Sequence, residues 1–210
     1  MTYLSSLESS TCALALDTSV LINIHKSSYG AEILRCIPNK KYITPIVREE
    51  MIRSIYQKDD AEKFIDQMIS DSIIILSMLD NDELMIYEEL ISGNSSLDDG
   101  EASTIAASIY RNASPVIDER KGRNRAIEIL PERPPYWSLD LLFHSDVIEG
   151  LGSDRATEAV YLALKEGRMR IHPDHCDSVV HTIGIDRAIK CHSLPNYKSR
   201  KAEWSLNGKR

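Results

Sequence analysis

The sequence predicts an α/β fold in which helices cover both faces of a central parallel sheet. Short apolar, β-branched segments alternate with longer amphipathic segments, and polar turns separate the two kinds. Strands that alternate with helices pair in parallel, because each helix carries the chain back to the edge where the previous strand began. With 210 residues, 42% of them hydrophobic, the chain is long enough for one such domain with an extension.

The predicted strands are short apolar segments bounded by polar residues or prolines: residues 12–16, 42–43, 73–76 and 115–117. The predicted helices carry an apolar stripe at the 3.6-residue period, and several begin near a capping residue or a proline. They are residues 20–25, which Thr18 or Ser19 can cap, 29–37, 45 to about 57, 60–69, 82–91, 100–110 and 122–130. At least one helix therefore follows each strand.

The pattern changes after residue 130, where three prolines interrupt the helical periodicity. The elements expected beyond them are a segment that completes the sheet near 138–143, a helix at 157–166, a short strand at 169–171 and two helices over 176–191 interrupted at Gly184. The tail from Asn196 is basic, and we expect it to be mobile. The predicted organisation is a domain at residues 1–145 and a helical extension at residues 146–210 that packs on it.

Charge and composition exclude some classes of function. A formal net charge of -7 argues against a protein that coats nucleic acid through a broad basic surface, but it allows an acidic metal-binding pocket beside local basic patches. No apolar stretch is long enough to span a bilayer, and the N-terminus lacks the pattern of an export signal. The four cysteines have no C-x-x-C spacing, so we expect no disulfide framework and a reducing, cytoplasmic location. Because no segment can span a bilayer, we also expect no membrane association.

Two predicted strands lead directly into an aspartate, Asp17 after the first and Asp118 after the last. The carboxyl ends of parallel strands meet at one edge of the sheet, where ligand sites form. We therefore expect the two carboxylates to converge, although about 100 residues separate them. Either aspartate alone could instead be a helix cap or a turn former.

A third carboxylate is expected from the helix that begins at Pro45. On a helical wheel, Glu50 falls at the edge of the apolar stripe and is the one expected to face a pocket. Glu49 lies nearly opposite the stripe, where Arg53 at i+4 can pair with it. Both glutamates could also be ordinary surface charges.

Glu101, the fourth carboxylate, has two competing interpretations. It lies three positions after Asp98 at the start of a predicted helix, which is the spacing of a capping box that stabilises a helix by about 1 kcal/mol. Glu101 could also face the same pocket as a metal ligand. The residues alone do not separate the two roles.

Four carboxylates in one pocket favour a bound cation. Like charges a few ångströms apart raise one another's pKa, so that some would be protonated at neutral pH. A divalent cation reverses this effect, and ligands that are all oxygen favour Mg²⁺ or Mn²⁺. One such ion, or a pair, can activate water and stabilise the leaving oxygen during cleavage of a phosphodiester. The candidate metal-binding and catalytic residues are Asp17, Glu50, Glu101 and Asp118.

These segments resemble the motifs of the PIN-domain family, which includes the VapC-like ribonucleases. Residues 13–22, A-L-A-L-D-T-S-V-L-I, resemble the opening motif, and residues 44–50, T-P-I-V-R-E-E, resemble the second. Residues 97–107 resemble the third motif in its G-E-A variant, and residues 116–120, V-I-D-E-R, resemble the fourth. All four occur in the family's order.

The resemblance implies a three-layer α/β/α sandwich with a central parallel sheet and a Mg²⁺- or Mn²⁺-dependent ribonuclease that cleaves single-stranded RNA. It also implies a toxin of a toxin–antitoxin pair, with an antitoxin or other regulatory protein as partner, and a homodimer. Two residues depart from the common pattern: many relatives carry Asp where this chain has Glu101, and Glu119 replaces the commoner Asp. Asp98 or Asp99 could contribute instead, and both rank below Glu101.

Several alternatives remain open. Arg120, Lys121 and Arg123, followed by Arg125, form the nearest basic patch and are candidates to hold the RNA backbone, but each could equally belong to a solvated helix face. The histidines and cysteines of residues 172–192 lack the paired spacing of a zinc site, which we rank low. Other functions consistent with the motifs are a catalytically inactive PIN-like interaction module and a related DNA-directed nuclease.

Overall fold

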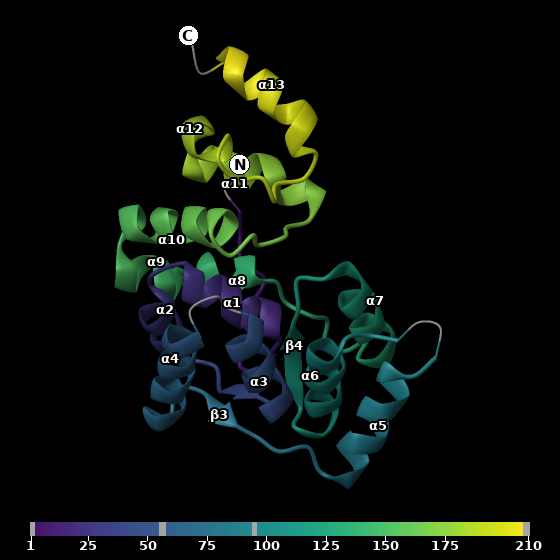
Figure 1. Ribbon diagram of the computed structural model, residues 1–210. Helices are drawn as coiled ribbons and strands as arrows, with labels where there is room; N and C mark the ends of the chain where they lie inside the picture. Colours follow the sequence, from purple (N-terminus) through teal and green to yellow (C-terminus); the bar gives the residue numbers. More distant parts are fainter. Residues whose placement is uncertain (1–2, 55–57, 94–95, 208–210) are drawn as a thin grey trace. The chain divides into compact units, whose positions relative to one another are not determined.

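The computed structural model describes residues 3–54, 58–93 and 96–207 and contains two compact units (Figure 1). The sheet unit comprises Ser9–Ile22 and Pro38–Trp137. The helical unit comprises the described residues of Met1–Glu8, Asn23–Ile37 and Ser138–Arg210. The expected domains at residues 1–145 and 146–210 stay a prediction.

The sheet consists of four parallel strands in the order β3-β2-β1-β4. The strands are β1 (Ala13–Leu16), β2 (Lys41–Ile43), β3 (Ile75–Leu76) and β4 (Ala113–Val116). Leu14 and Leu16 of β1 and all of β4 are buried, as expected for strands with helices on both sides. The α/β fold with a central, all-parallel sheet flanked by helices, which the sequence predicts, is therefore confirmed.

The helices of the sheet unit lie close to their predicted positions. They are α3 (Pro45–Ser54), α4 (Lys58–Ser70), α5 (Asn81–Ile91), α6 (Asp99–Tyr110), α7 (Arg120–Ile129) and the first part of α1 (Thr18–Lys26), whose residues from Asn23 onward belong to the helical unit. The predicted continuation of α3 to about residue 57 lies outside the described residues. Gly100–Ser108 of α6 is buried throughout, because its small side chains let the helix pack closely on β1 and β4.

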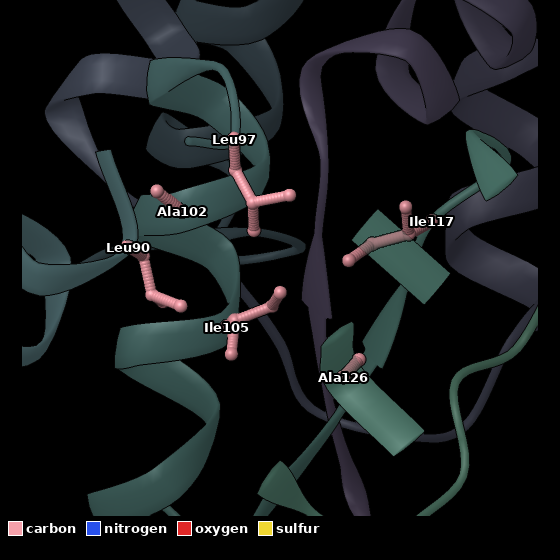
Figure 2. Close-up of a cluster of buried hydrophobic side chains, with 6 residues drawn as sticks. All are labelled: Leu90, Leu97, Ala102, Ile105, Ile117 and Ala126. Atoms are coloured by element: carbon pink, nitrogen blue, oxygen red, sulfur yellow. The ribbon is translucent and has the colours of Figure 1, made fainter. Parts of the chain in front are cut away.

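An apolar cluster supports the carboxyl end of β4 (Figure 2). It brings together side chains of α5, of the turn before α6, of α6, of the residue after β4 and of α7: Leu90, Leu97, Ala102, Ile105, Ile117 and Ala126. Burying a side chain as large as leucine or isoleucine stabilises a fold by about 1.5–3 kcal/mol. The cluster therefore holds the starts of α6 and α7 beside the end of β4.

The described residues of the helical unit also form the α-helices α2 (Gly30–Cys36), α8 (Ser138–Leu142), α9 (Ser145–Leu151), α10 (Ser153–Lys165), α11 (Cys176–Ile183), α12 (Ile185–Ala188) and α13 (Tyr197–Asn207), and the 3-10 helix η1 (Pro173–His175). The break expected at Gly184 is confirmed, and its φ of 84° is the left-handed conformation that glycine adopts readily. None of the described helices is long and apolar enough to cross a membrane.

Two expectations for the C-terminal part were wrong. Residues 138–143 do not complete the sheet, because the chain forms α8 after Tyr136 bridges to Val116 of β4. In α8, Asp140 accepts hydrogen bonds from the Tyr3 hydroxyl and the Ser6 amide. Residues 169–171 form no strand. In the tail, Tyr197–Asn207 forms the helix α13, in which only 7% of the surface of Trp204 is exposed, and the expected mobility of the tail stays a prediction.

Candidate functional site

The candidate site lies at the carboxyl ends of β1 and β4. Leu16 pairs with Val116, so Asp17 and Asp118 follow neighbouring strands at the same edge of the sheet. From β1 the chain proceeds to β2 on one side, whereas β4 adds to β1 on the other side. Ligands of open parallel sheets bind at such a change of direction.

Asp17 is buried where β1 passes into α1. Its side chain is 3% exposed, and its Oδ2 accepts hydrogen bonds from the Ser19 amide at 3.2 Å and the Ser19 hydroxyl at 2.5 Å. Burial raises the pKa of Asp17 to about 7, and the nearby charge of Asp98 adds to the increase against the opposing effect of Ser19. A carboxylate is therefore held in place here at an electrostatic cost.

Glu50 reaches the same place from α3. Its Oε2 accepts a hydrogen bond of 2.6 Å from the Thr18 hydroxyl, and burial raises its pKa, with further contributions from Asp98 and Asp99. Glu49 is exposed and pairs with Arg53 at 3.0 Å, as the helical wheel predicts. The wheel therefore distinguished the two adjacent glutamates correctly.

Gly100 marks the point where Asp17 and Glu50 converge. A Cβ atom at this glycine would lie 2.4 Å from Glu50 Oε2, 2.6 Å from Thr18 Oγ1 and 3.1 Å from Asp17 Oδ1. Three oxygens from β1, α1 and α3 thus surround one point at the start of α6. Only glycine leaves room for them, a constraint that sequence patterns did not reveal.

Glu101 extends the acidic group from the first turn of α6. It is 3% exposed, and its Oε1 is buried without a hydrogen-bond partner. The pKa of Glu101 is raised to about 8. Burial makes the largest contribution, and the charges of Asp98, Asp17 and Glu119 raise it further. Its side chain lies against Gly122 of α7, where a Cβ atom would be 2.6 Å from Oε1.

The capping alternative for Glu101 holds only in part. Asp98 caps α6 by accepting a 2.9 Å hydrogen bond from the Glu101 amide, but the Glu101 side chain lies against Gly122. A reciprocal capping box occurs instead at α5, between Asp80 and Glu83. Glu101 therefore belongs to a cap through its backbone and to the acidic group through its carboxylate.

Three further acidic residues lie at the same edge of the sheet or at the starts of α6 and α7. Asp118 is 5% exposed and lies two residues after β4, and the charge of Glu119 raises the pKa of Glu101. Asp99 accepts a 2.9 Å hydrogen bond from the Tyr87 hydroxyl. Burial, and then that bond, raises the pKa of Tyr87 to about 12, so the phenol stays a donor. Tyr87 was not singled out from the sequence.

The types of donor atom suit a divalent cation. All are carboxylate or hydroxyl oxygens, which Mg²⁺ and Mn²⁺ prefer, and the unpaired Oε1 of Glu101 is the kind of atom that an ion satisfies. Within the described ranges, however, no three Asp, Glu, His or Cys side chains form a group that could hold a metal ion. Hydrogen bonds to Ser19 and Thr18 hold Asp17 and Glu50 instead.

The basic residues of α7 differ in their contacts. Arg120 is exposed, and the ammonium of Lys121 donates to the Ser96 carbonyl. The Arg123 guanidinium donates to the carbonyls of Ile117, Pro135 and Tyr136 at 2.7–2.9 Å and stacks on Trp137 at 3.5 Å from the ring centroid. Arg125 forms ion pairs with Glu128 and Glu89. Arg123 therefore ties α7 to the segment after it.

Comparison with known proteins agrees with this geometry. The family model DUF3368, a PIN domain, matches residues 13–129, which is more than half of the chain and spans every residue of the candidate site. No curated protein matches the chain. PIN domains are generally nucleases and typically use divalent metals. The chain therefore belongs to the PIN-domain family.

Proposed function

We propose that this protein is a Mg²⁺- or Mn²⁺-dependent endoribonuclease that cleaves single-stranded RNA. Asp17, Glu50, Glu101 and Asp118 hold the metal, directly or through water. The observation that carries the proposal is the convergence of the Asp17 and Glu50 oxygens beside Gly100, next to a buried Glu101 oxygen that has no partner. A fold without a ligand here has no evident reason to concentrate buried negative charge.

The residues of the chain have separate tasks in this mechanism. When bound, the divalent ion activates water for attack on phosphorus and stabilises the leaving oxygen. Ser19 orients the Asp17 carboxylate, and Thr18 orients Glu50, each through the hydrogen bond described above. Arg120 and Lys121 contact the RNA backbone, while Arg123 both orients α7 and contributes positive charge.

The biological setting follows the family resemblance and is part of the proposal. The protein acts in the cytoplasm as a homodimer and as the toxin of a toxin–antitoxin or defence system. Its partner is an antitoxin or another regulatory protein. Expression of the lone gene from an inducible promoter should arrest growth, and co-expression of the neighbouring gene should relieve the arrest.

A catalytically inactive PIN-like module is the second candidate function. The observation that favours it is that the described residues contain no ready set of three metal ligands. Such a module would bind a partner and would show neither Mn²⁺ binding nor cleavage. A DNA-directed nuclease is a third outcome, which a substrate panel identifies.

The decisive test measures cleavage and metal binding by variants of the site residues, with a variant of Glu49 as the control. Purified protein is incubated with labelled single-stranded RNA, double-stranded RNA and single-stranded DNA, with and without Mg²⁺ or Mn²⁺. Asp17→Asn and Glu50→Gln should each reduce RNA cleavage by about 100-fold or more, because a ligand and its negative charge are lost. They should also weaken Mn²⁺ binding, measured by electron paramagnetic resonance.

Glu49→Gln is the matched control. It removes the same charge one residue away, at an exposed side chain that pairs only with Arg53 among the contacts described above, and it should leave cleavage unchanged. Full cleavage by a folded Asp17→Asn variant would refute the assignment of this residue. Absence of both Mn²⁺ binding and cleavage in the unaltered protein would favour the inactive module.

A further inference from the structure

A basic pocket lies in the helical unit, outside the residues that match the PIN-domain model. It is a hollow of about 620 Å³ between the end of α10 and the residues after α12. Lys165, Arg168, Arg170, Lys190 and His192 line it, and the carboxylate among the lining residues is Glu166. This concentration of positive charge contrasts with the net charge of -7 of the whole chain.

The two walls of the pocket are joined by the fold. The Ser193 hydroxyl donates a 2.9 Å hydrogen bond to the Leu164 carbonyl, and the Met169 amide donates to the Ala163 carbonyl at 3.0 Å. In the segment after α10, Met169 and Ile171 are buried while Arg168 and Arg170 are exposed. Both guanidinium groups are therefore accessible to a ligand from solvent.

Arg168 adopts a conformation that arginine rarely takes. Its φ is 57°, in the left-handed region, although a glycine precedes it in the sequence. Gly167 is needed for a different reason, because a Cβ atom there would lie 2.7 Å from the Ala163 carbonyl oxygen and 2.8 Å from Asn23 Oδ1. Strain at a non-glycine residue of this kind is a recognised sign of a functional side chain.

Helix electrostatics account for only part of this charge. Lys165 ends α10, where a cation interacts favourably with the helix dipole, and it pairs with Glu166 at 2.7 Å. Arg170 and Lys190 lie beyond the last turn of α10 and of α12, respectively. A pocket lined by exposed cationic side chains suits a ligand that carries several negative charges along its length.

We propose that this pocket binds the phosphodiester backbone of single-stranded nucleic acid, with Arg168, Arg170 and Lys190 as the phosphate-contacting residues. His192, whose ring lies 4.8 Å from that of Tyr197, supplies an aromatic surface for a base. The inference rests on the proposed function only for the choice of RNA as the probe. The pocket would give the protein a second contact with RNA that is independent of the acidic site.

The test measures binding without cleavage. Full-length protein is titrated into a labelled single-stranded RNA oligonucleotide in the presence of a chelator, by fluorescence anisotropy at several salt concentrations, and RNA integrity is checked on a gel. The triple variant Arg168→Gln, Arg170→Gln and Lys190→Gln should raise Kd by about tenfold or more at low salt. The slope of log Kd against log salt should fall by about 2, as expected when three phosphate contacts are lost.

The matched control removes the same three charges elsewhere. Arg35→Gln, Arg53→Gln and Lys63→Gln alter two arginines and one lysine, all exposed and outside the pocket, and should leave Kd within about twofold. Equal Kd values for the two triple variants would overturn the proposal. The proposal would also be overturned if the pocket triple variant lost binding to vesicles of anionic lipid but kept its binding to RNA.

A single substitution guards against misfolding of the triple variant. Arg168→Gly relieves the left-handed conformation, so it should raise Tm by a few degrees while weakening RNA binding and lowering the salt slope by about 1. A more stable variant with unchanged RNA binding would contradict a phosphate contact by Arg168. Because the chelator removes catalysis, failure of this binding and failure of the proposed nuclease are seen in different experiments.

Discussion

At the scale of single residues, two glycines make the acidic group possible. Gly100 leaves space for the oxygens of Asp17, Thr18 and Glu50, and Gly122 leaves space for the Glu101 carboxylate. Glycine normally costs a helix about 1 kcal/mol relative to alanine, so its presence in the first turns of α6 and α7 needs a compensating reason. The close approach of the carboxylates supplies that reason.

Gly122→Ala tests this constraint. The new Cβ atom would lie 2.6 Å from Glu101 Oε1, so the carboxylate must move, and a shift of about 1 Å in a reacting group can lower cleavage by about 100-fold. Cleavage rates of single-stranded RNA are compared with those of Asn124→Ala, an exposed change in the same helix that should have no effect. Undiminished cleavage by Gly122→Ala would show that the position of Glu101 is unimportant.

The sequence predicted some residue positions better than others. Helical periodicity separates Glu50 from Glu49 because adjacent side chains point about 100° apart on a helix. The same reasoning cannot separate the capping role of Glu101 from a metal-binding one, since both place this residue in the first turn of α6. Only the packing of its side chain against Gly122 distinguishes them.

Among the elements, an ion pair between Arg111, which follows α6, and the buried Glu83 of α5 connects these two helices. The Arg111 guanidinium donates to the Ser77 hydroxyl at 2.9 Å, to the Met78 carbonyl at 2.6 Å and to the carboxylate of Glu83. Glu83 is 1% exposed, and it also receives a hydrogen bond from the Asp80 amide. One arginine therefore holds the link between β3 and α5.

Arg111→Met should destabilise the protein by about 3–5 kcal/mol, because it leaves the Glu83 carboxylate buried without its cation. The measurement is the free energy of unfolding in urea. The double variant Arg111→Met and Glu83→Gln should recover part of the loss, since the buried charge is removed as well. A double variant no more stable than the single one would mean that the hydrogen bonds to Ser77 and Met78 dominate.

Elements were predicted well where one local signal dominated. Residues 12–16 and 115–117 are apolar and are each followed by an aspartate; the first segment contains β1, and the second overlaps the end of β4. The prediction for residues 138–143 was wrong because they are mostly apolar, with Ser138 and Asp140 as the polar residues, a composition that suits a buried strand and a buried helix equally. Long-range hydrogen bonds from Tyr3 and Ser6 to Asp140 accompany the helical arrangement.

At the scale of the whole molecule, the acidic group opposes folding in the absence of a cation. The pKa values of Asp17 and Glu101 rise on folding from 3.8 and 4.5 to about 7 and about 8, so the folded chain binds more protons than the unfolded chain. Stability from these groups is therefore greatest below about pH 4 and is lost as pH rises toward about 8. A divalent ion bound at the site should reverse the loss.

The Tm of metal-free protein should accordingly fall between about pH 5 and about pH 8, and added Mn²⁺ should raise Tm more at the higher pH. Differential scanning fluorimetry with and without chelator measures both effects. Glu101→Gln should flatten the pH dependence and increase Tm of the metal-free protein at about pH 8. An equal effect of Mn²⁺ at both pH values would argue against ionised carboxylates as its ligands.

Local sequence patterns are enough to predict the alternation of strands and helices, the aspartates that follow β1 and β4, and the orientation of Glu49 and Glu50. These features follow from local periodicity and from the edge at which parallel strands end. Three other features depend on how the chain packs: which oxygens lie beside Gly100, the contact of Glu101 with Gly122, and the shared pocket of Arg168 and Lys190. Such contacts join residues far apart in the chain, and their distances depend on packing, which no local pattern records.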